Sequence, residues 1–122
     1  MSVTHSTEIR NDIADAVLAQ IDVDAAAGYV EMQDSGGTEV ATLNLSYPAG
    51  TVTAEKLTFD AISNDASATG GTLAKFEIKS NIGTSKLAGA IGISGSDINS
   101  SILVVDTGWS VQISLLTYTA PE

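Results

Sequence analysis

From Gly28 onward, apolar side chains recur at every second position through most of this chain of 122 residues. The clearest case is the segment Leu73–Lys79, in which Phe76 and Ile78 lie between charged residues. Successive side chains of a strand point to opposite faces, so this pattern puts one face in a core and the other in solvent. The alternation therefore predicts a mainly β protein.

Clusters of turn-forming residues, such as Asp34–Gly37 and Tyr47–Gly50, separate the alternating segments. The segments expected to be strands are Tyr29–Gln33, Val40–Ser46, Val52–Phe59, Leu73–Lys79, Leu87–Ile93, Ile102–Val105 and Val111–Tyr118. The last two are expected to form a hairpin through Asp106–Gly108. Short strands with regular turns are typical of an antiparallel β-sandwich or a jelly roll. The expected core positions are Leu43, Leu45, Phe59, Phe76, Ile78, Ile91, Val111 and Ile113.

The N-terminal region shows a helical period in place of the alternation. Apolar residues recur there at spacing four, at Ile9, Ile13, Val17 and Ile21. This spacing predicts one short amphipathic helix over about Thr7 to Ile21, with a polar residue before it as its cap. The expected organisation is an N-terminal arm and helix at 1–27, followed by a single compact β-sandwich body at 28–122.

The apolar stripe of this helix, formed by Ile9, Ile13, Val17 and Ile21, is the candidate partner-docking site. A short helix rich in β-branched residues is marginal alone, so its stripe needs cover. The stripe could bury in a groove on a partner, as amphipathic helices do. It could equally cover one open end of its own sandwich, and the sequence leaves both alternatives open.

Charge and composition restrict the possible partners. The chain has 5 Lys and Arg against 15 Asp and Glu, a formal net charge of -10, and no cysteine. This balance opposes binding to nucleic acid and to anionic membranes, where Lys and Arg supply the attraction. Neither a signal peptide nor a membrane-spanning apolar run is evident, so synthesis in a cytoplasm is expected.

Groups that could carry chemistry are few. His5 is the single histidine, and it stands in the N-terminal arm, without a cysteine to complete a metal site. Asp22 and Asp24 offer alternate carboxylates but lack the longer ligand series of a calcium loop. Trp109 could stack on a sugar, although a single Trp more often fills a core or an interface. The sequence therefore predicts no metal, no cofactor and no enzyme activity.

The order of segments along the chain carries a family resemblance. The segments concerned are Thr4–Arg10, Ile13–Val17, Gly28, Ala41–Pro48, Ala68–Thr72, Phe76, Ser94–Ile98, Gly108, Val111–Ile113 and Thr117–Pro121. In this order they resemble the head decoration (cement) proteins of tailed bacteriophages. The chain departs from the pattern at two places. Ala49 and Gly50 follow Pro48 where the family has a large aromatic, and Lys75 and Lys79 stand near Phe76 where the family has an Arg.

The resemblance implies a virion structural protein that binds the outer surface of a phage head in many copies and stabilises it. Its implied partners are the major capsid protein and itself, as a homo-oligomer with a trimer as the first expectation. Its implied location is the capsid surface, after synthesis in the host cytoplasm. The main alternative is a carbohydrate-binding or adhesin-like β-sandwich module, and a small enzyme is a more distant one.

Overall fold

The computed structural model describes residues 4–94, 96, 98–100, 102–113 and 116–119. In this part of the chain one helix precedes a series of short strands, and the predicted mainly β class is confirmed. The elements are α1 (Thr7–Ile21), β1 (Tyr29–Gln33), β2 (Glu39–Asn44), β3 (Gly50–Thr53), β4 (Lys56–Phe59), β5 (Gly71–Thr72), β6 (Lys75–Lys79), β7 (Ser85–Gly92), β8 (Ile98–Asn99), β9 (Val104–Val105) and β10 (Thr117–Thr119).

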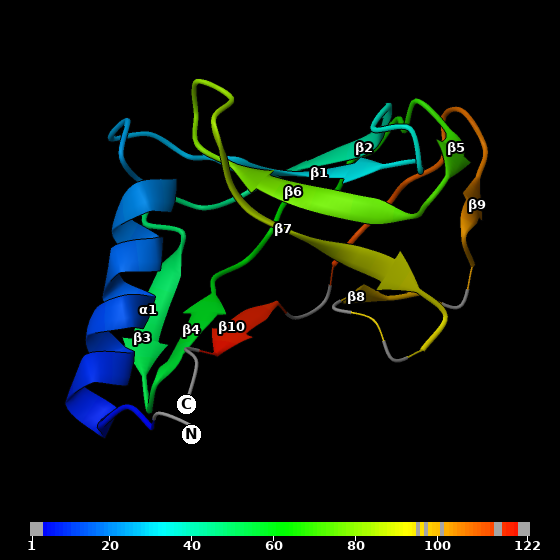
Figure 1. The fold of residues 1–122 in the computed structure, drawn as a ribbon. Helices are drawn as coiled ribbons and strands as arrows, with labels where there is room; N and C mark the ends of the chain where they lie inside the picture. Colours follow the sequence, from blue (N-terminus) through cyan, green and yellow to red (C-terminus); the bar gives the residue numbers. More distant parts are fainter. Residues whose placement is uncertain (1–3, 95, 97, 101, 114–115, 120–122) are drawn as a thin grey trace.

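Two sheets face each other, and the helix stands beside them (Figure 1). The large sheet has the strand order β2-β1-β6-β7-β8, and the small sheet has the order β10-β4-β3. All described pairs are antiparallel except β7 with β8, which pair in parallel at Ile91 and Gly92. A separate short pair joins β5 to β9.

One apolar core lies between the sheets. The inward positions of the large sheet, such as Val30, Leu43 and Ile78, join Leu57 and Phe59 of the small sheet in a single buried cluster. Most of the predicted core is confirmed, since these residues are buried: Leu43, Leu45, Phe59, Phe76, Ile78 and Ile91. The remaining two, Val111 and Ile113, are partly buried and pack against the cluster.

The segment Val52–Phe59 was expected to be one strand, and this prediction is wrong. The chain turns back at Ala54 and Glu55, so β3 and β4 form a hairpin in which Thr53 pairs with Lys56. Both turn residues have positive φ, 53° and 70°, a conformation that usually calls for Gly or Asn. Neither is present, so the local sequence carried no turn signal, and contacts from elsewhere in the fold stabilise the turn.

The expected C-terminal hairpin is also absent from the described residues. β9 pairs with β5 instead, and β10 pairs with β4, with Tyr118 opposite Leu57. Val111 forms an isolated bridge with Asp65. Residues 114 and 115 of the expected strand lie outside the described residues. Alternation shows which side chains share a face but not which strand is the neighbour, so local pairing was the wrong choice here.

Candidate docking site

Helix α1 spans Thr7–Ile21, the range predicted from the spacing of the apolar residues. Ser6 is its N-cap, and its hydroxyl accepts the Ile9 N–H at 3.3 Å. Asp22 closes the helix with its own N–H bonded to the Leu18 carbonyl at 3.0 Å. Beyond the helix, a Cβ at Gly28 would clash with the Lys79 carbonyl oxygen, so the chain needs a glycine where it enters β1.

The predicted stripe is divided between the body and the surface. Ile21 is fully buried and belongs to the common core, together with Ala14 of the same helix. Ile13 and Val17 are half-buried and pack against that core. Ile9 is 49% exposed. The C-terminal half of the helix therefore packs on its own body, while Ile9 leaves apolar surface exposed. Burial of the stripe on a partner stays a prediction.

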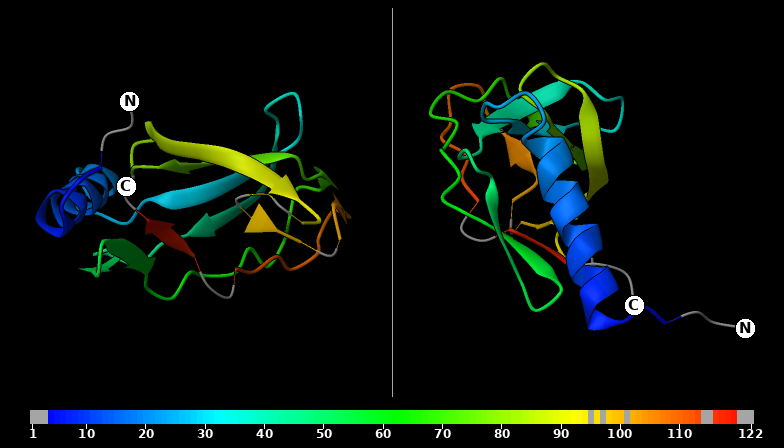
Figure 2. Two further views of the ribbon diagram at one scale, coloured as in Figure 1. Left: turned by 60° about the horizontal axis from the view of Figure 1, so that its bottom comes forward. Right: turned by 90° about the vertical axis from the view of Figure 1, so that its left-hand side faces the viewer.

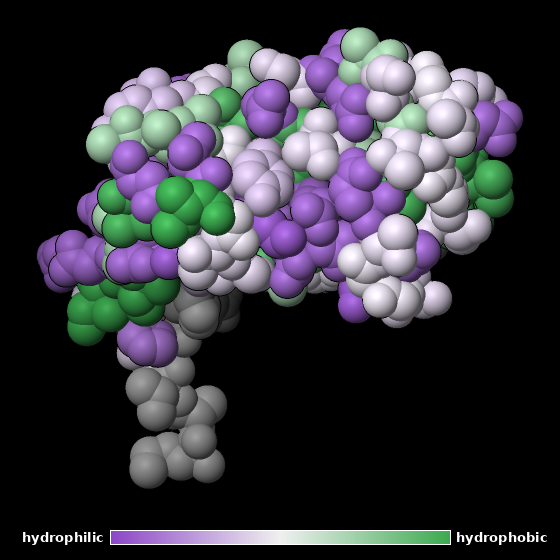
Figure 3. All heavy atoms as spheres, turned by 90° about the horizontal axis from the view of Figure 1, so that it is seen from above, coloured by the Kyte–Doolittle hydropathy of each residue, from purple (hydrophilic) through white to green (hydrophobic). Residues whose placement is uncertain are grey.

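A shallow groove runs along the exposed side of the stripe. It has a volume of about 430 Å³ and lies between α1 and the start of β7. Ile13, Val17 and Ala16 form its apolar wall, while Ser85 and Lys86 form part of the other wall. The Lys86 ammonium donates a hydrogen bond of 3.0 Å to the Gln20 amide oxygen. Figure 3 shows apolar side chains among polar ones on the side of the molecule where the helix lies.

The N-terminal half of the helix is attached to the β3–β4 turn through Glu55. Its carboxylate accepts a hydrogen bond from the Thr7 hydroxyl at 2.9 Å and forms an ion pair with Arg10. Its backbone N–H donates to the Asn11 side-chain oxygen at 2.8 Å. These contacts hold the exposed end of the stripe in place, and no pattern in the sequence indicated Glu55.

Two aspartates that follow the helix accept hydrogen bonds from backbone N–H groups. The Asp22 carboxylate accepts the Ala49 N–H, with both oxygens at 3.2 Å, and the Asp24 carboxylate accepts the Ile82 N–H at 3.1 Å. Across the described residues, no group of three or more His, Cys, Asp or Glu side chains could hold a metal ion. His5 lies just before the helix, outside any such group.

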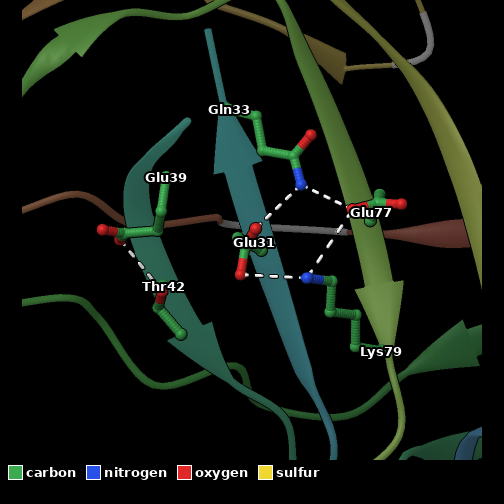
Figure 4. A network of polar contacts seen from close by, with 6 residues as sticks. All are labelled: Glu31, Gln33, Glu39, Thr42, Glu77 and Lys79. Atoms are coloured by element: carbon green, nitrogen blue, oxygen red, sulfur yellow. Dashed lines mark hydrogen bonds and ion pairs between the residues drawn. The ribbon is translucent and has the colours of Figure 1, made fainter. Parts of the chain in front are cut away.

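The outer face of the large sheet carries a connected polar network (Figure 4). The Gln33 amide nitrogen donates to Glu31 at 2.8 Å and to Glu77 at 2.6 Å. The Lys79 ammonium lies 3.2 Å from Glu31 and 3.7 Å from Glu77. The network joins β1 to β6, and Figure 3 shows the polar face that it helps to form.

Two ionisable groups of this network have shifted pKa values. Hydrogen bonds from Gln33 and then Ser85 lower the pKa of Glu77, and nearby Lys79 adds to this. Burial acts to lower the pKa of Lys79, but the hydrogen bond and charge of Glu31, with the charge of Glu77, raise it. Each of these two pKa shifts favours the charged form, so Glu77 and Lys79 face each other as an ion pair on the sheet.

A second apolar surface lies away from the helix. Trp109 is 46% exposed and lines a groove of about 200 Å³ together with Ile102, which is also exposed. Ser100, Ser110 and Gln112 supply polar groups to the same groove. The backbone of Trp109 is held by two hydrogen bonds, to Asp106 and from Ala68. The sequence singled out Trp109, and the structure brings Ile102 and the polar residues to it.

Comparisons with known proteins returned no match among family models, curated proteins or solved structures. Among the helices that the structure describes, none is both long and apolar enough to span a lipid bilayer.

Proposed function

We propose that this chain is a capsid decoration protein of a tailed bacteriophage, a virion structural protein that binds the outside of the head and stabilises it. The observation that carries the proposal is the exposed part of the helix stripe. Ile9, Ile13 and Val17 follow one side of α1, and the last two line the open groove beside β7. The order of sequence segments, which resembles decoration proteins along nearly the whole chain, supports the same function.

The geometry of the stripe suits docking on a rigid partner. Glu55 fixes the N-terminal half of the helix on the body, so little order has to be created when the stripe is buried. The partner in this proposal is the major capsid protein, which offers an apolar ridge to the groove. The acidic surface would repel packaged DNA, and the location is the capsid surface after synthesis in the host cytoplasm.

The proposal includes self-association and excludes catalysis. Many copies of a decoration protein bind one head, and a homo-oligomer presents several stripes at once, which raises the apparent affinity. The trimer expected from the resemblance stays a prediction. No cofactor, nucleic acid or membrane has a part in this function.

The direct test is the composition and density of purified particles. Mass spectrometry should find the chain in purified heads at a fixed ratio to the major capsid protein, and a cryo-EM map should show its density outside the shell. Absence of the chain from particles of the phage that encodes it would overturn the proposal.

The exposed Trp109 supports a second candidate, a carbohydrate-binding or adhesin-like module. An indole face beside Ser110 and Gln112 is the arrangement that stacks on a sugar ring and bonds its hydroxyls. A glycan array with the wild-type chain and the Trp109→Ala variant separates the two functions. Glycan binding that is lost in Trp109→Ala favours the module, and an array without signal favours decoration.

A further inference from the structure

The outer face of the small sheet carries an array of threonines around one lysine. Residues directly opposite each other in neighbouring strands lie on the same face of a sheet. In one row Thr58 of β4 lies between Thr51 and Thr117, and all three are exposed. In the next row Lys56 lies between Thr53 and Thr119, and these are also exposed. The threonine face consists of Thr51, Thr53, Lys56, Thr58, Thr117 and Thr119.

The threonine face points away from the core. Val52, Leu57 and Tyr118 lie opposite one another in the row between the two rows of this face. Leu57 is fully buried, and Val52 and Tyr118 pack against the core. Because side chains alternate along a strand, the threonine face lies on the solvent side of the sheet. Threonine is restricted at χ1, so the sheet holds the hydroxyls in a regular array.

The polar groups of the threonine face are unpaired within the chain. None of its threonine hydroxyls forms a hydrogen bond with a described residue, and the Lys56 ammonium forms neither a hydrogen bond nor an ion pair with one. The face itself contains no carboxylate, and Asp60 lies beyond the end of β4, about 13 Å along the chain from Lys56. Hydroxyl donors around an ammonium fit a partner that supplies carboxylates.

Helix α1 carries a surface of that kind. Glu8, Asp12 and Asp15 follow each other at spacings of four and three residues, which places them on one side of the helix and defines an acidic stripe. All are exposed, and none forms a hydrogen bond or an ion pair with a described residue. One residue turns a helix by about 100°, so the acidic stripe lies beside the apolar stripe that begins at Ile9. Figure 2 shows α1 at the outside of the body.

The two surfaces match in length as well as in charge. The acidic stripe extends about 10 Å along the helix axis from Glu8 to Asp15. Strands about 4.8 Å apart give the small sheet, from β3 across β4 to β10, a width of about 10 Å. A helix laid across these strands therefore places the central Asp12 over Lys56, and the outer carboxylates over the threonine hydroxyls of β3 and β10.

We propose that the threonine face of one copy binds the acidic stripe of α1 of a second copy. This inference rests on the self-association part of the proposed function and names the surfaces that meet. The contact joins two different patches, so it is heterologous, and a closed ring of copies uses each patch once. It leaves Ile13 and Val17 in the groove beside β7 open to the capsid. Exposed ion pairs are weak and screened by salt, so the oligomer should dissociate as the salt concentration rises.

Zero-length carbodiimide cross-linking tests the contact, because it joins an amine to a carboxylate only where the two touch. The wild type should give covalent products at multiples of 12.5 kDa on a denaturing gel, with Lys56 joined to the acidic stripe in the peptide masses. Lys56→Gln should lose most of these products. The matched control is Lys75→Gln, at another exposed lysine on β6, which should keep them. Equal cross-linking of the two variants would overturn the contact.

Charge reversal tests the pairing of Lys56 with Asp12. Lys56→Glu and Asp12→Lys should each lower the mass measured by light scattering, and the variant that combines them should regain the mass of the wild type. Both residues are exposed and have no partner within the chain, so the melting temperature should not change. Lys75→Glu adds the same charge on the large sheet and should keep the oligomer.

The outcomes separate this contact from self-association in general. A wild type that is monomeric at all concentrations overturns both the contact and the self-association. An oligomer with the same mass in Lys56→Glu overturns the contact alone, as does a combined variant that associates no better than the single ones. Detection of the chain in purified heads, which tests the proposed function, is independent of all these results.

Discussion

The Arg10 guanidinium on helix α1 forms an ion pair with the Glu55 carboxylate at the tip of the β3–β4 hairpin. The two side chains are 15% and 22% exposed. The same carboxylate accepts a hydrogen bond from Thr7, so one residue in a turn with positive φ joins the helix to the small sheet.

Glu55→Ala should therefore weaken the attachment of the helix. The substitution keeps a Cβ at the strained φ and removes only the side-chain contacts, so we expect a loss of about 1–2 kcal/mol in the free energy of unfolding. Ala54→Gly is the matched control, since it relieves a positive φ without touching the helix, and should change stability by less than about 1 kcal/mol. Urea denaturation measures both, and equal effects would contradict this role of Glu55.

The division of the helix stripe predicts unequal costs for the same substitution at its two ends. Ile21→Ala removes a fully buried side chain and should cost about 2–5 kcal/mol. Ile9→Ala changes an exposed position and should stay within about 0.5 kcal/mol. Thermal or urea unfolding measures the stability of the two variants against the wild type. A similar loss at both positions would mean that the helix does not pack on the body as described.

Asp65 should protect the edge of β2. Asp65→Ala removes the acceptor of the Thr42 N–H and of the Ser67 N–H, so the Thr42 amide should exchange with solvent faster than in the wild type. Glu39→Ala is a suitable control, because it removes the bonds to Thr42 and Thr69 side chains but no backbone partner. Hydrogen exchange measured by NMR distinguishes the two variants. An unchanged exchange rate of the Thr42 amide in Asp65→Ala would show that Asp65 does not protect this edge.

Features of the fold that depend on residues close together in the sequence could be predicted, and features that depend on residues far apart could not. The bounds of α1 follow from the helical period and the capping residue, and the buried faces of β1 and β6 follow from the alternation of apolar residues. Both patterns can be read from the local sequence. The β3–β4 turn depends on Glu55 meeting Arg10, 45 residues away, so it could not be predicted from Ala54 and Glu55 alone. The helical period placed the apolar stripe on one helix, but a period cannot say which of its residues the body will bury, and docking through the stripe stays a prediction.

The network on the large sheet predicts a pH effect at Glu77. Its pKa is lowered in the folded state, chiefly by Gln33, so its contribution to stability is present above the ordinary value of 4.5 and is lost as the pH falls through the lower folded pKa. Glu77→Gln should be less stable than the wild type near neutral pH, and the difference should shrink in acid. Urea midpoints against pH test this, and a constant difference would contradict it.

Docking through the exposed part of the helix stripe is the central claim, and binding to undecorated heads tests it most directly. Sedimentation of purified heads with added chain should show saturable binding of the wild type. Ile9→Glu should lose this binding, whereas Ile93→Glu should keep it, because it adds the same charge at a 69% exposed isoleucine outside the stripe. No binding by the wild type, or equal binding by both variants, would contradict docking through the stripe.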